Sequence, residues 1–202
     1  MDEVVGHMRE KVVLPALESV KVVDRPKPDV PPEWYFPYAE TLSDVPPMAS
    51  FGEGFRYHIT GLFHDRAGFP TQRLDEINPW ITRVFRKIDR NLGDIILTEG
   101  EGLDDARTLV IAYGCLARSA RQAIRMCRRH TVGLLILKTI WPFPEEAVVE
   151  AAHGARRVIV PEMNLGQLAL EVERLVGRNK VVRVNRADGE MITPDQILRA
   201  IA

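Results

Sequence analysis

The second half of the chain repeats one pattern, a short apolar run followed by an amphipathic stretch of helical length, and few folds accommodate this pattern. In the intervening stretches apolar residues recur at helical spacing, as Ala120, Ala123 and Ile124 do. Apolar strands that alternate with helices are typical of parallel sheets covered by helices on both faces. We therefore expect a doubly wound, mostly parallel open α/β sheet over residues 104–202. The predicted strands are residues 108–113, 132–137, 157–160 and 181–184.

Residues that commonly begin helices support this interpretation. Thr193 and Gln196 have the spacing of a capping box, with Pro194 at the first helical position. The run Asn164-Leu165-Gly166-Gln167 resembles a second capping box, with Asn164 as the cap of a further helix.

Half of the 14 prolines lie within residues 24–48. Each proline fixes φ and lacks an N–H donor, so this stretch is expected to form neither a helix nor a central strand. It also contains Trp34, Tyr35, Phe36 and Tyr38, although disordered segments are usually poor in aromatic residues. We interpret it as an extended arm whose rings pack on another surface; a disordered connector is the alternative.

The sequence is expected to fall into three segments. Residues 1–20 are too few to form a core and are interpreted as the remnant of an upstream domain. Residues 21–103 are expected to contain the arm, a loop and a connecting helix, and residues 104–202 the α/β domain. Apolar residues from about Leu74 to Ile88 recur every three or four positions, which predicts one helix with an apolar stripe that faces a core.

Composition excludes several classes of function. The 27 Lys and Arg residues against 28 Asp and Glu give a net charge of −1, which disfavours nucleic acid as the main partner. No apolar run approaches the roughly 20 residues of a membrane-spanning helix, so no membrane association is expected. Cys115 and Cys127 are too few for a disulfide framework and too far apart for a CxxC motif. A cytoplasmic location is the default expectation.

Ligands of open parallel sheets bind beyond the carboxyl ends of the strands. The first such turn contains Gly114 and Cys115, and the helix after it carries Arg118 and Arg121, so this turn is a possible anion site. The alternative is an ordinary strand-to-helix turn with solvated arginines. A helix amino terminus lowers a thiol pKa, which makes Cys115 the better candidate for a reactive thiol.

Polar residues follow two other predicted strands. Lys138 closes one strand, while Glu162, Asn164 and Gln167 follow another, and we predict that these four form an interface at the sheet edge. Lys138 is expected to pair with Glu162 across neighbouring strand ends.

A loop between Gly61 and Gly68 contains His64, Asp65 and Arg66. It lacks a convincing third metal ligand, so no metal site is predicted. The loop is a candidate substrate or interface loop. An acid–base pair is one interpretation of it, and local capping and salt bridging is the other.

Sequence motifs of several enzyme classes are absent. There is no Walker loop, GDG-type diphosphate-binding segment, cysteine cluster or GxSxG motif. No catalytic residue is therefore assigned.

Several stretches together resemble one family, the α chain of 2-oxoacid:ferredoxin oxidoreductases, especially the 2-oxoglutarate type. They are DEVVGHMRE (2–10), TGLFHDRAG (60–68), LKTIWPFP (137–144) and PEMNLGQL (161–168). The resemblance implies the carboxyl-terminal part of that chain, with its transketolase-C-terminal-like domain. Phe63 departs from the acidic residue that the family pattern has at that place.

The resemblance also implies an activity at the level of a complex. The family decarboxylates a 2-oxoacid on thiamine diphosphate, transfers electrons through iron–sulfur clusters to ferredoxin and releases an acyl-CoA. Thiamine diphosphate, Mg and the cluster are expected in the assembled enzyme with a β subunit, and no cofactor is expected on this chain alone. The chain is expected to serve assembly and to form part of the substrate or CoA entrance, and to be inactive by itself. The alternatives are a stand-alone anion- or nucleotide-binding regulatory α/β domain, or an enzyme that uses His64 and Asp65.

Overall fold

A computed structural model describes residues 7, 9, 11–22, 24–127 and 131–202. The chain divides into two compact units, one formed by Val12–Leu92 and the other containing Gly93–Ala202. Most of the stretch interpreted as the end of an upstream domain, residues 2–10, lies outside the described residues.

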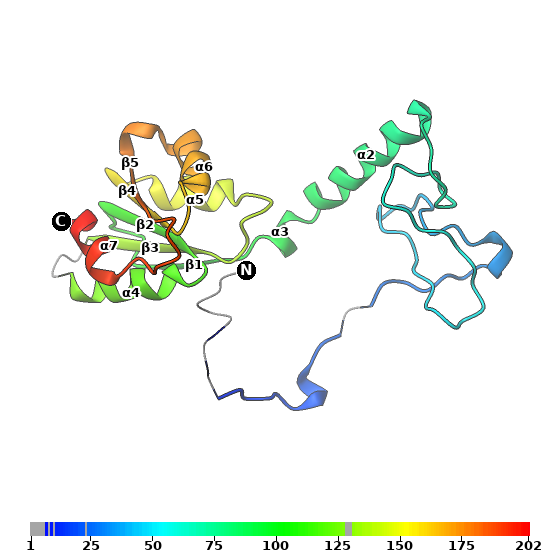
Figure 1. Cartoon of the computed structure of the whole chain (residues 1–202), viewed down its shortest axis with the longest axis horizontal. Helices are drawn as coiled ribbons and strands as arrows, with labels where there is room; N and C mark the ends of the chain where they lie inside the picture. The colour runs from blue at the N-terminus through cyan, green and yellow to red at the C-terminus, as the bar shows by residue number, and fades with distance from the viewer. Residues whose placement is uncertain (1–6, 8, 10, 23, 128–130) are drawn as a thin grey trace. The chain divides into compact units, whose positions relative to one another are not determined.

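The unit that contains Gly93–Ala202 is built on a five-stranded sheet in the order β1-β3-β2-β4-β5 (Figure 1). Its parallel part contains β2 (Thr108–Tyr113), β3 (Val132–Leu137), β4 (Arg157–Glu162) and β5 (Val181–Asn185). The edge strand β1 (Thr98–Glu101) pairs antiparallel with β3. The predicted α/β class with a mostly parallel sheet is confirmed, whereas β1 was not predicted from the sequence.

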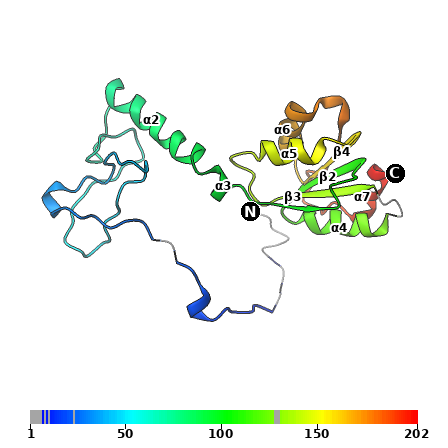
Figure 2. The same ribbon diagram turned by 180° about the vertical axis from the view of Figure 1, so that it is seen from behind.

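Helices cover both faces of this sheet (Figures 1 and 2). One face packs against α4 (Leu116–Met126) and α7 (Pro194–Ile201), and the other against α5 (Glu145–Ala152) and α6 (Gln167–Val176). A short 3₁₀ helix, η3 (Arg178–Lys180), precedes β5.

The two cores follow from the alternation of side chains along each strand. Val110 packs in the core under α4 and α7, and its neighbour Ile111 packs in the core under α5 and α6; both are completely buried. The predicted capping box at the start of α7 is confirmed, because Gln196 N donates to Thr193 Oγ1 at 3.4 Å and Thr193 N donates to Gln196 Oε1 at 2.8 Å.

In the described residues of the Val12–Leu92 unit, the one strand-like pairing is an isolated bridge between His64 and Pro70. It contains two 3₁₀ turns, η1 (Leu17–Ser19) and η2 (Pro32–Trp34), and one long helix, α2 (Leu74–Asp89). A short helix, α3 (Leu92–Ile95), follows α2. The proline-rich stretch forms one 3₁₀ turn and no α-helix or strand, as its prolines predict.

The helix predicted from Leu74 is confirmed, but the interpretation of its apolar stripe as core is wrong for the described chain. The one buried residue of α2 is Arg83, and Phe85 is 56% exposed. Periodicity identifies an apolar face but does not say what covers it.

The aromatic rings of the proline-rich stretch pack largely within their own unit. Tyr35 is buried, and its ring meets Phe55 and Tyr57 edge-on at centroid distances of 5.2 and 5.4 Å. Its hydroxyl donates to the Pro47 carbonyl and accepts from Ala49 N, both at 3.2 Å. The stretch is therefore held against residues of the same unit.

Among the described residues, no helix combines the length and the apolar character that crossing a bilayer requires.

Candidate functional site

Polar side chains meet at the carboxyl ends of β2 and β4. Tyr113 ends β2 and its hydroxyl donates to Glu162 Oε1 at 3.1 Å, while Asn164 Nδ2 donates to the Tyr113 hydroxyl at 2.8 Å and to Glu162 Oε1 at 3.1 Å. Burial and the neighbouring Glu162 carboxylate raise the pKa of Tyr113 to about 12, so its phenol stays protonated at neutral pH.

The Glu162 carboxylate is completely buried and occupies the amino terminus of α6. Its Oε1 accepts from Leu168 N at 2.9 Å and its Oε2 from Ala169 N at 2.8 Å. These N–H groups lie in the first turn of a helix, where the helix dipole favours a negative charge. All of the hydrogen bonds of this carboxylate join it to groups of the chain itself, so Glu162 stabilises the start of α6.

Asn164 supports the same helix start by a route that differs from the predicted cap. Its Oδ1 accepts from Gly166 N at 2.7 Å and from Gln167 N at 3.2 Å. The residue that directly precedes the helix is Gly166, with φ of 98°, a conformation that favours glycine. Gln167 begins α6 and is exposed.

The predicted pairing of Lys138 with Glu162 is wrong. Lys138 follows β3 and Glu162 ends β4, and β2 lies between these two strands. Lys138 Nζ instead lies 2.8 Å from Oε2 of Glu99 on the unpredicted strand β1.

Two glutamates of strand β1 also form ion pairs with Arg121, one member of the predicted anion site. Arg121 Nε donates to Glu101 Oε1 at 2.5 Å, and its second nitrogen pairs with Glu99. The hydrogen bond to Glu101 raises the pKa of the Arg121 guanidinium further. Arg121 is thus committed to two carboxylates and fastens β1 to α4.

The other members of the predicted anion site lie at the start of α4. Gly114 makes the turn with φ of 56°, and Arg118 is exposed on the first turn of the helix. Cys115 is buried, with its Sγ 3.6 Å from Met163 Sδ. A buried thiol against a thioether is a poor nucleophile, because reactivity requires the exposed thiolate.

In the Val12–Leu92 unit, Asp65 organises its own loop. Its Oδ1 accepts from Ala67 N at 2.9 Å and Phe69 N at 3.0 Å, and Asp65 N donates to the Phe69 carbonyl at 2.9 Å. Gly68 has φ of 92°, and a Cβ there would lie 1.8 Å from the His58 carbonyl oxygen. The loop conformation thus requires both Asp65 and Gly68.

His64 is buried between two aromatic rings. It stacks on Tyr38 at a centroid distance of 3.6 Å and meets Trp80 edge-on at 5.2 Å. Its Nδ1 lies 3.1 Å from the Asp65 carbonyl oxygen, which only accepts. His64 and the Asp65 carboxylate therefore do not form the hydrogen-bonded acid–base pair that one interpretation of the sequence required.

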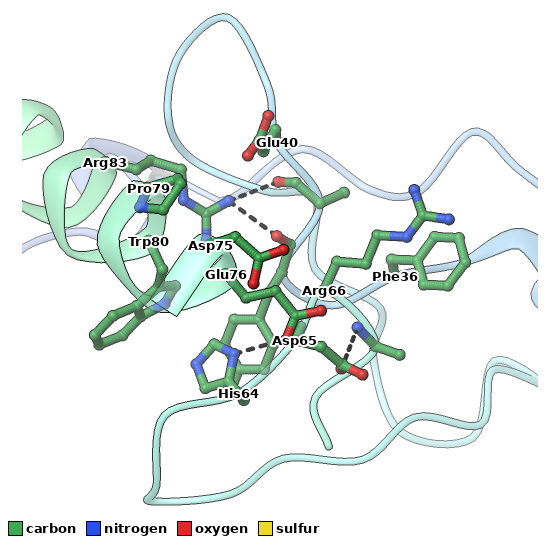
Figure 3. Close-up of a pocket in the computed structure, with 13 residues that line it drawn as sticks. Phe36, Glu40, His64, Asp65, Arg66, Asp75, Glu76, Pro79, Trp80 and Arg83 are labelled. Carbon is green, nitrogen blue, oxygen red and sulfur yellow. Dashed lines mark hydrogen bonds between the residues drawn. The ribbon is translucent and has the colours of Figure 1, made fainter. Parts of the chain in front are cut away.

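The predicted loop does line a pocket, and Figure 3 shows the side chains around it. The pocket has a volume of about 610 Å³, and its walls come from residues 36–40, residues 64–67 and residues 75–83 of α2. Arg66 lies in this wall with its guanidinium carbon 4.2 Å from the centre of the Phe36 ring.

Arg83 connects α2 to the proline-rich segment in the same wall. It is 6% exposed, and one of its terminal nitrogens donates to the carbonyls of Tyr38 and Ala39, both at 2.9 Å. Burial lowers the pKa of Arg83, whose usual value is far above neutral. On the same helix, Arg86 binds the buried Asp44 carboxylate and holds its pKa below the usual range.

Sequence reasoning did not identify Tyr113, Arg83 or Asp44. A signal for Arg83 exists, because proline-rich segments have carbonyls without matching N–H donors and long basic side chains can supply them. Arg25 does the same, donating to the Pro46 carbonyl at 2.6 Å.

The described residues contain no group of three or more His, Cys, Asp or Glu side chains placed to hold a metal ion.

Comparison with known proteins matches residues 106–197 to the family model described as pyruvate:ferredoxin oxidoreductase core domain II. The 2-oxoglutarate synthase subunit KorA of Methanothermobacter thermautotrophicus is 40% identical over 208 residues, which cover 99% of this chain and 54% of that protein. The KorA subunit of Methanocaldococcus jannaschii is 38% identical with the same coverage. The chain thus spans about half the length of these curated relatives.

Two other matches add detail. The ketoisovalerate oxidoreductase subunit VorB of Methanothermobacter thermautotrophicus is 32% identical over 71% of this chain and 39% of that protein. Among solved structures, the 2-oxoglutarate:ferredoxin oxidoreductase from Magnetococcus marinus, with 2-oxoglutarate, coenzyme A and succinyl-CoA bound, has a TM-score of 0.79. It is 25% identical and covers 93% of this chain and 33% of that chain.

Proposed function

We propose, from the premise that this chain belongs to the 2-oxoacid:ferredoxin oxidoreductase family, that it forms part of the α subunit of such an enzyme. The proposed reaction of the complex is the thiamine-diphosphate-dependent oxidative decarboxylation of a 2-oxoacid to an acyl-CoA, with ferredoxin as electron acceptor. In this proposal the chain supports subunit assembly and forms part of the substrate or CoA entrance.

The observation that carries the proposal is the extent of the similarity. The KorA relatives match 99% of the chain, which includes both the α/β unit and the irregular Val12–Leu92 unit. A match to VorB covers 71% at lower identity, and this difference favours 2-oxoglutarate as the substrate.

In this proposal, the residues that bind the cofactors belong to other parts of the complex. Iron–sulfur clusters are held by sets of cysteine thiolates, commonly four, and this chain has two cysteines, one of them buried against Met163. The charged side chains of Glu162 and Arg121, which lie at or near the carboxyl-terminal edge of the sheet, bind groups of the chain itself. The residues present thus do not fit a cluster, and we place thiamine diphosphate, Mg and the cluster with the β subunit and the rest of the α subunit.

The assembly role is supported by the exposed apolar surface of the Val12–Leu92 unit. Large apolar side chains that point to solvent over an extended surface mark sites of contact with other proteins. Among these side chains, Trp34 is 70% exposed, Leu42 101% and Phe51 92%. A cytoplasmic location is part of this proposal and stays a prediction.

A stand-alone anion-binding regulatory domain is not favoured. The relationship to KorA subunits extends over both units, and Arg121 of the predicted anion site is committed to Glu99 and Glu101.

Co-expression tests the proposal. The chain is produced with the β-type subunit of a 2-oxoglutarate synthase and with the portion of a KorA relative that this chain does not match. We expect a co-purifying complex that reduces ferredoxin in the presence of 2-oxoglutarate and CoA, and we expect the chain alone to be inactive and to bind no thiamine diphosphate.

Deletion of residues 26–47, most of the proline-rich stretch, tests whether this stretch contributes to subunit assembly. We expect the deletion to prevent recovery of the complex while the α/β unit keeps its far-UV circular dichroism. A complex that fails to form with the intact chain, or 2-oxoacid oxidation by the purified chain alone, would contradict the proposal.

A further inference from the structure

We propose that the pocket of about 610 Å³ in the Val12–Leu92 unit receives a basic side chain, arginine or lysine, from the β subunit (Figure 3). This inference rests on the proposed function, because it names how one surface of the chain recognises its partner. Three features of the pocket lead to it: its charge, the engagement of its own donors, and an unpartnered acceptor in its wall.

The wall and its ion-pair partners carry a small excess of negative charge. Four carboxylates line the pocket against two guanidinium groups, those of Arg66 and Arg83, and Arg73 supplies a third from outside the wall. Arg73 pairs with two of the carboxylates, those of Asp75 and Glu76. The other two carboxylates are those of Glu40 and Asp65.

The two arginines in the wall make contacts within the chain. Arg83 is 6% exposed and donates to the backbone carbonyls of Tyr38 and Ala39. Arg66 places its guanidinium over the face of Phe36. Arg83 thus builds the wall rather than recognising an anion.

His64 adds an acceptor that the protein itself does not use. Its Nδ1 faces the Asp65 carbonyl oxygen, which only accepts, so Nδ1 carries a hydrogen and Nε2 is the ring nitrogen able to accept. Nε2 has no hydrogen-bond partner among the described residues, although His64 is 94% buried. Because no side-chain nitrogen or oxygen in the described part of the chain is both fully buried and unpaired, Nε2 keeps access to solvent, and His64 lines this pocket.

Asp65 contributes a second acceptor. Its Oδ1 accepts both loop N–H groups, and no hydrogen bond within the described residues uses its Oδ2. Together with the Glu40 carboxylate, which Arg83 and Arg86 attract, these groups place three acceptors in the wall. Aromatic rings of Tyr38 and Trp80 complete the wall, and such rings favour a cation close to them.

This chemistry selects among possible occupants. The phosphates of CoA bring negative charge and no donors, so the carboxylates of the pocket repel them. A guanidinium or ammonium group brings several donors and the opposite charge, which the acceptors and rings can satisfy. A basic side chain of the partner fits both requirements.

A charge substitution at Glu40 tests the inference in the co-expressed complex. Glu40 is exposed, and Glu40→Lys reverses the charge of the pocket wall. We expect the dissociation constant of the β subunit to rise roughly tenfold, with a smaller rise for Glu40→Gln. The effect should decrease as salt is raised, because the interaction is electrostatic.

Glu18→Lys is the matched control. Glu18 is exposed in the same unit and lies outside both the pocket wall and residues 26–47, so its substitution changes the net charge of the unit by the same amount. Near-UV circular dichroism of each free variant checks that the unit keeps its aromatic packing. Glu40→Gln keeps the test valid if the lysine variant disturbs that packing, because it removes the charge without adding a new one.

The outcomes separate this inference from the proposed function. Equal affinities for the parent chain, Glu40→Lys, Glu40→Gln and Glu18→Lys overturn the inference and leave the assembly role intact. Binding of CoA by the free parent chain, seen as a CoA-dependent rise in Tm that Glu40→Lys enlarges, overturns it in favour of an anionic occupant. Failure of the parent chain to bind the β subunit overturns both.

Discussion

The two units of this chain reach order by different means. The α/β unit buries complete layers of aliphatic side chains on both faces of its sheet, and residues such as Leu109, Ile111 and Val158 have no exposed surface. The Val12–Leu92 unit buries few side chains and is held by side chains that bind backbone carbonyls, as Arg83 and Tyr35 do.

This difference indicates different roles. A unit with two closed cores gains its stability from its own apolar burial. A unit that leaves rings and aliphatic side chains in solvent keeps unused apolar area for a partner. We therefore expect substitutions in the first unit to change the free energy of unfolding, and substitutions on the surface of the second to change the affinity of the complex.

The largest effect is expected at Glu162 in the α/β unit. Glu162→Ala removes the acceptor of the buried Leu168 N and Ala169 N and of the half-buried Tyr113 hydroxyl and Asn164 Nδ2, so four donors lose a charged partner. We expect the free energy of unfolding to fall by about 4 kcal/mol. Guanidinium unfolding followed by far-UV circular dichroism measures the change.

Glu171→Ala on the exposed side of α6 is the control, with an expected loss of less than about 0.5 kcal/mol. Equal losses for the two variants would show that the buried carboxylate contributes nothing special to the unit.

The next prediction compares the substitution of one apolar residue from each unit. Ile111→Ala removes a completely buried side chain and is expected to lower the free energy of unfolding by about 3 kcal/mol. Phe85→Ala removes an exposed ring, so we expect a change within about 0.5 kcal/mol in the free chain and a clear loss of affinity in the complex. Unfolding and titration with the β subunit measure the two quantities, and a large loss of stability for Phe85→Ala would remove the distinction between the units.

A smaller effect is expected at two glycines of the 60–71 loop. Gly68→Ala places a Cβ against the His58 carbonyl at a positive φ, whereas the Cβ of Gly61→Ala meets nothing within 4 Å. We expect Gly68→Ala to destabilise the loop by about 2 kcal/mol and Gly61→Ala to leave it unchanged. Hydrogen exchange of residues 60–71 measures both, and equal protection in the two variants would contradict the structural role of Gly68.

The smallest effect is confined to alkaline pH. Because the folded state raises the pKa of Tyr113 from 10 to about 12, it favours the neutral phenol. The stability that this contributes is complete below pH 10 and is lost as pH rises from 10 to 12. We expect Tyr113→Phe to be less stable than the parent chain at pH 8 and to lose less stability between pH 10 and pH 12.

Guanidinium midpoints at pH 8, 10, 11 and 12 measure this difference, and groups that titrate elsewhere cancel between the two proteins. Parallel pH profiles would contradict the assigned environment of Tyr113.

The sequence predicted those parts of the fold whose pattern is set by burial. Strands β2, β3 and β4 contain continuous apolar runs, because parallel strands that are covered on both faces expose no polar side. Strand β1 escaped prediction because it is a sheet edge with the sequence Thr-Glu-Gly-Glu, whose glutamates pair with Arg121 and Lys138 rather than packing in a core. Edge strands of this kind depend on tertiary partners that local patterning does not record.

The candidate site residues show the same limit. Asp65 and Asn164 lie in loops that the sequence located correctly, and local turn chemistry explains both. The pairing of Lys138 required the strand order, which places β2 between β3 and β4. The pocket at His64 required the contact between a proline-rich segment and α2, which are about 40 residues apart in the sequence.

The position of Glu162 has a consequence for what α6 needs from outside the chain. The first N–H groups of a helix can bind an anion, and at the start of α6 a completely buried carboxylate of the chain itself takes that place. The negative charge that other helix starts obtain from a bound phosphate or sulfate is therefore built into this one.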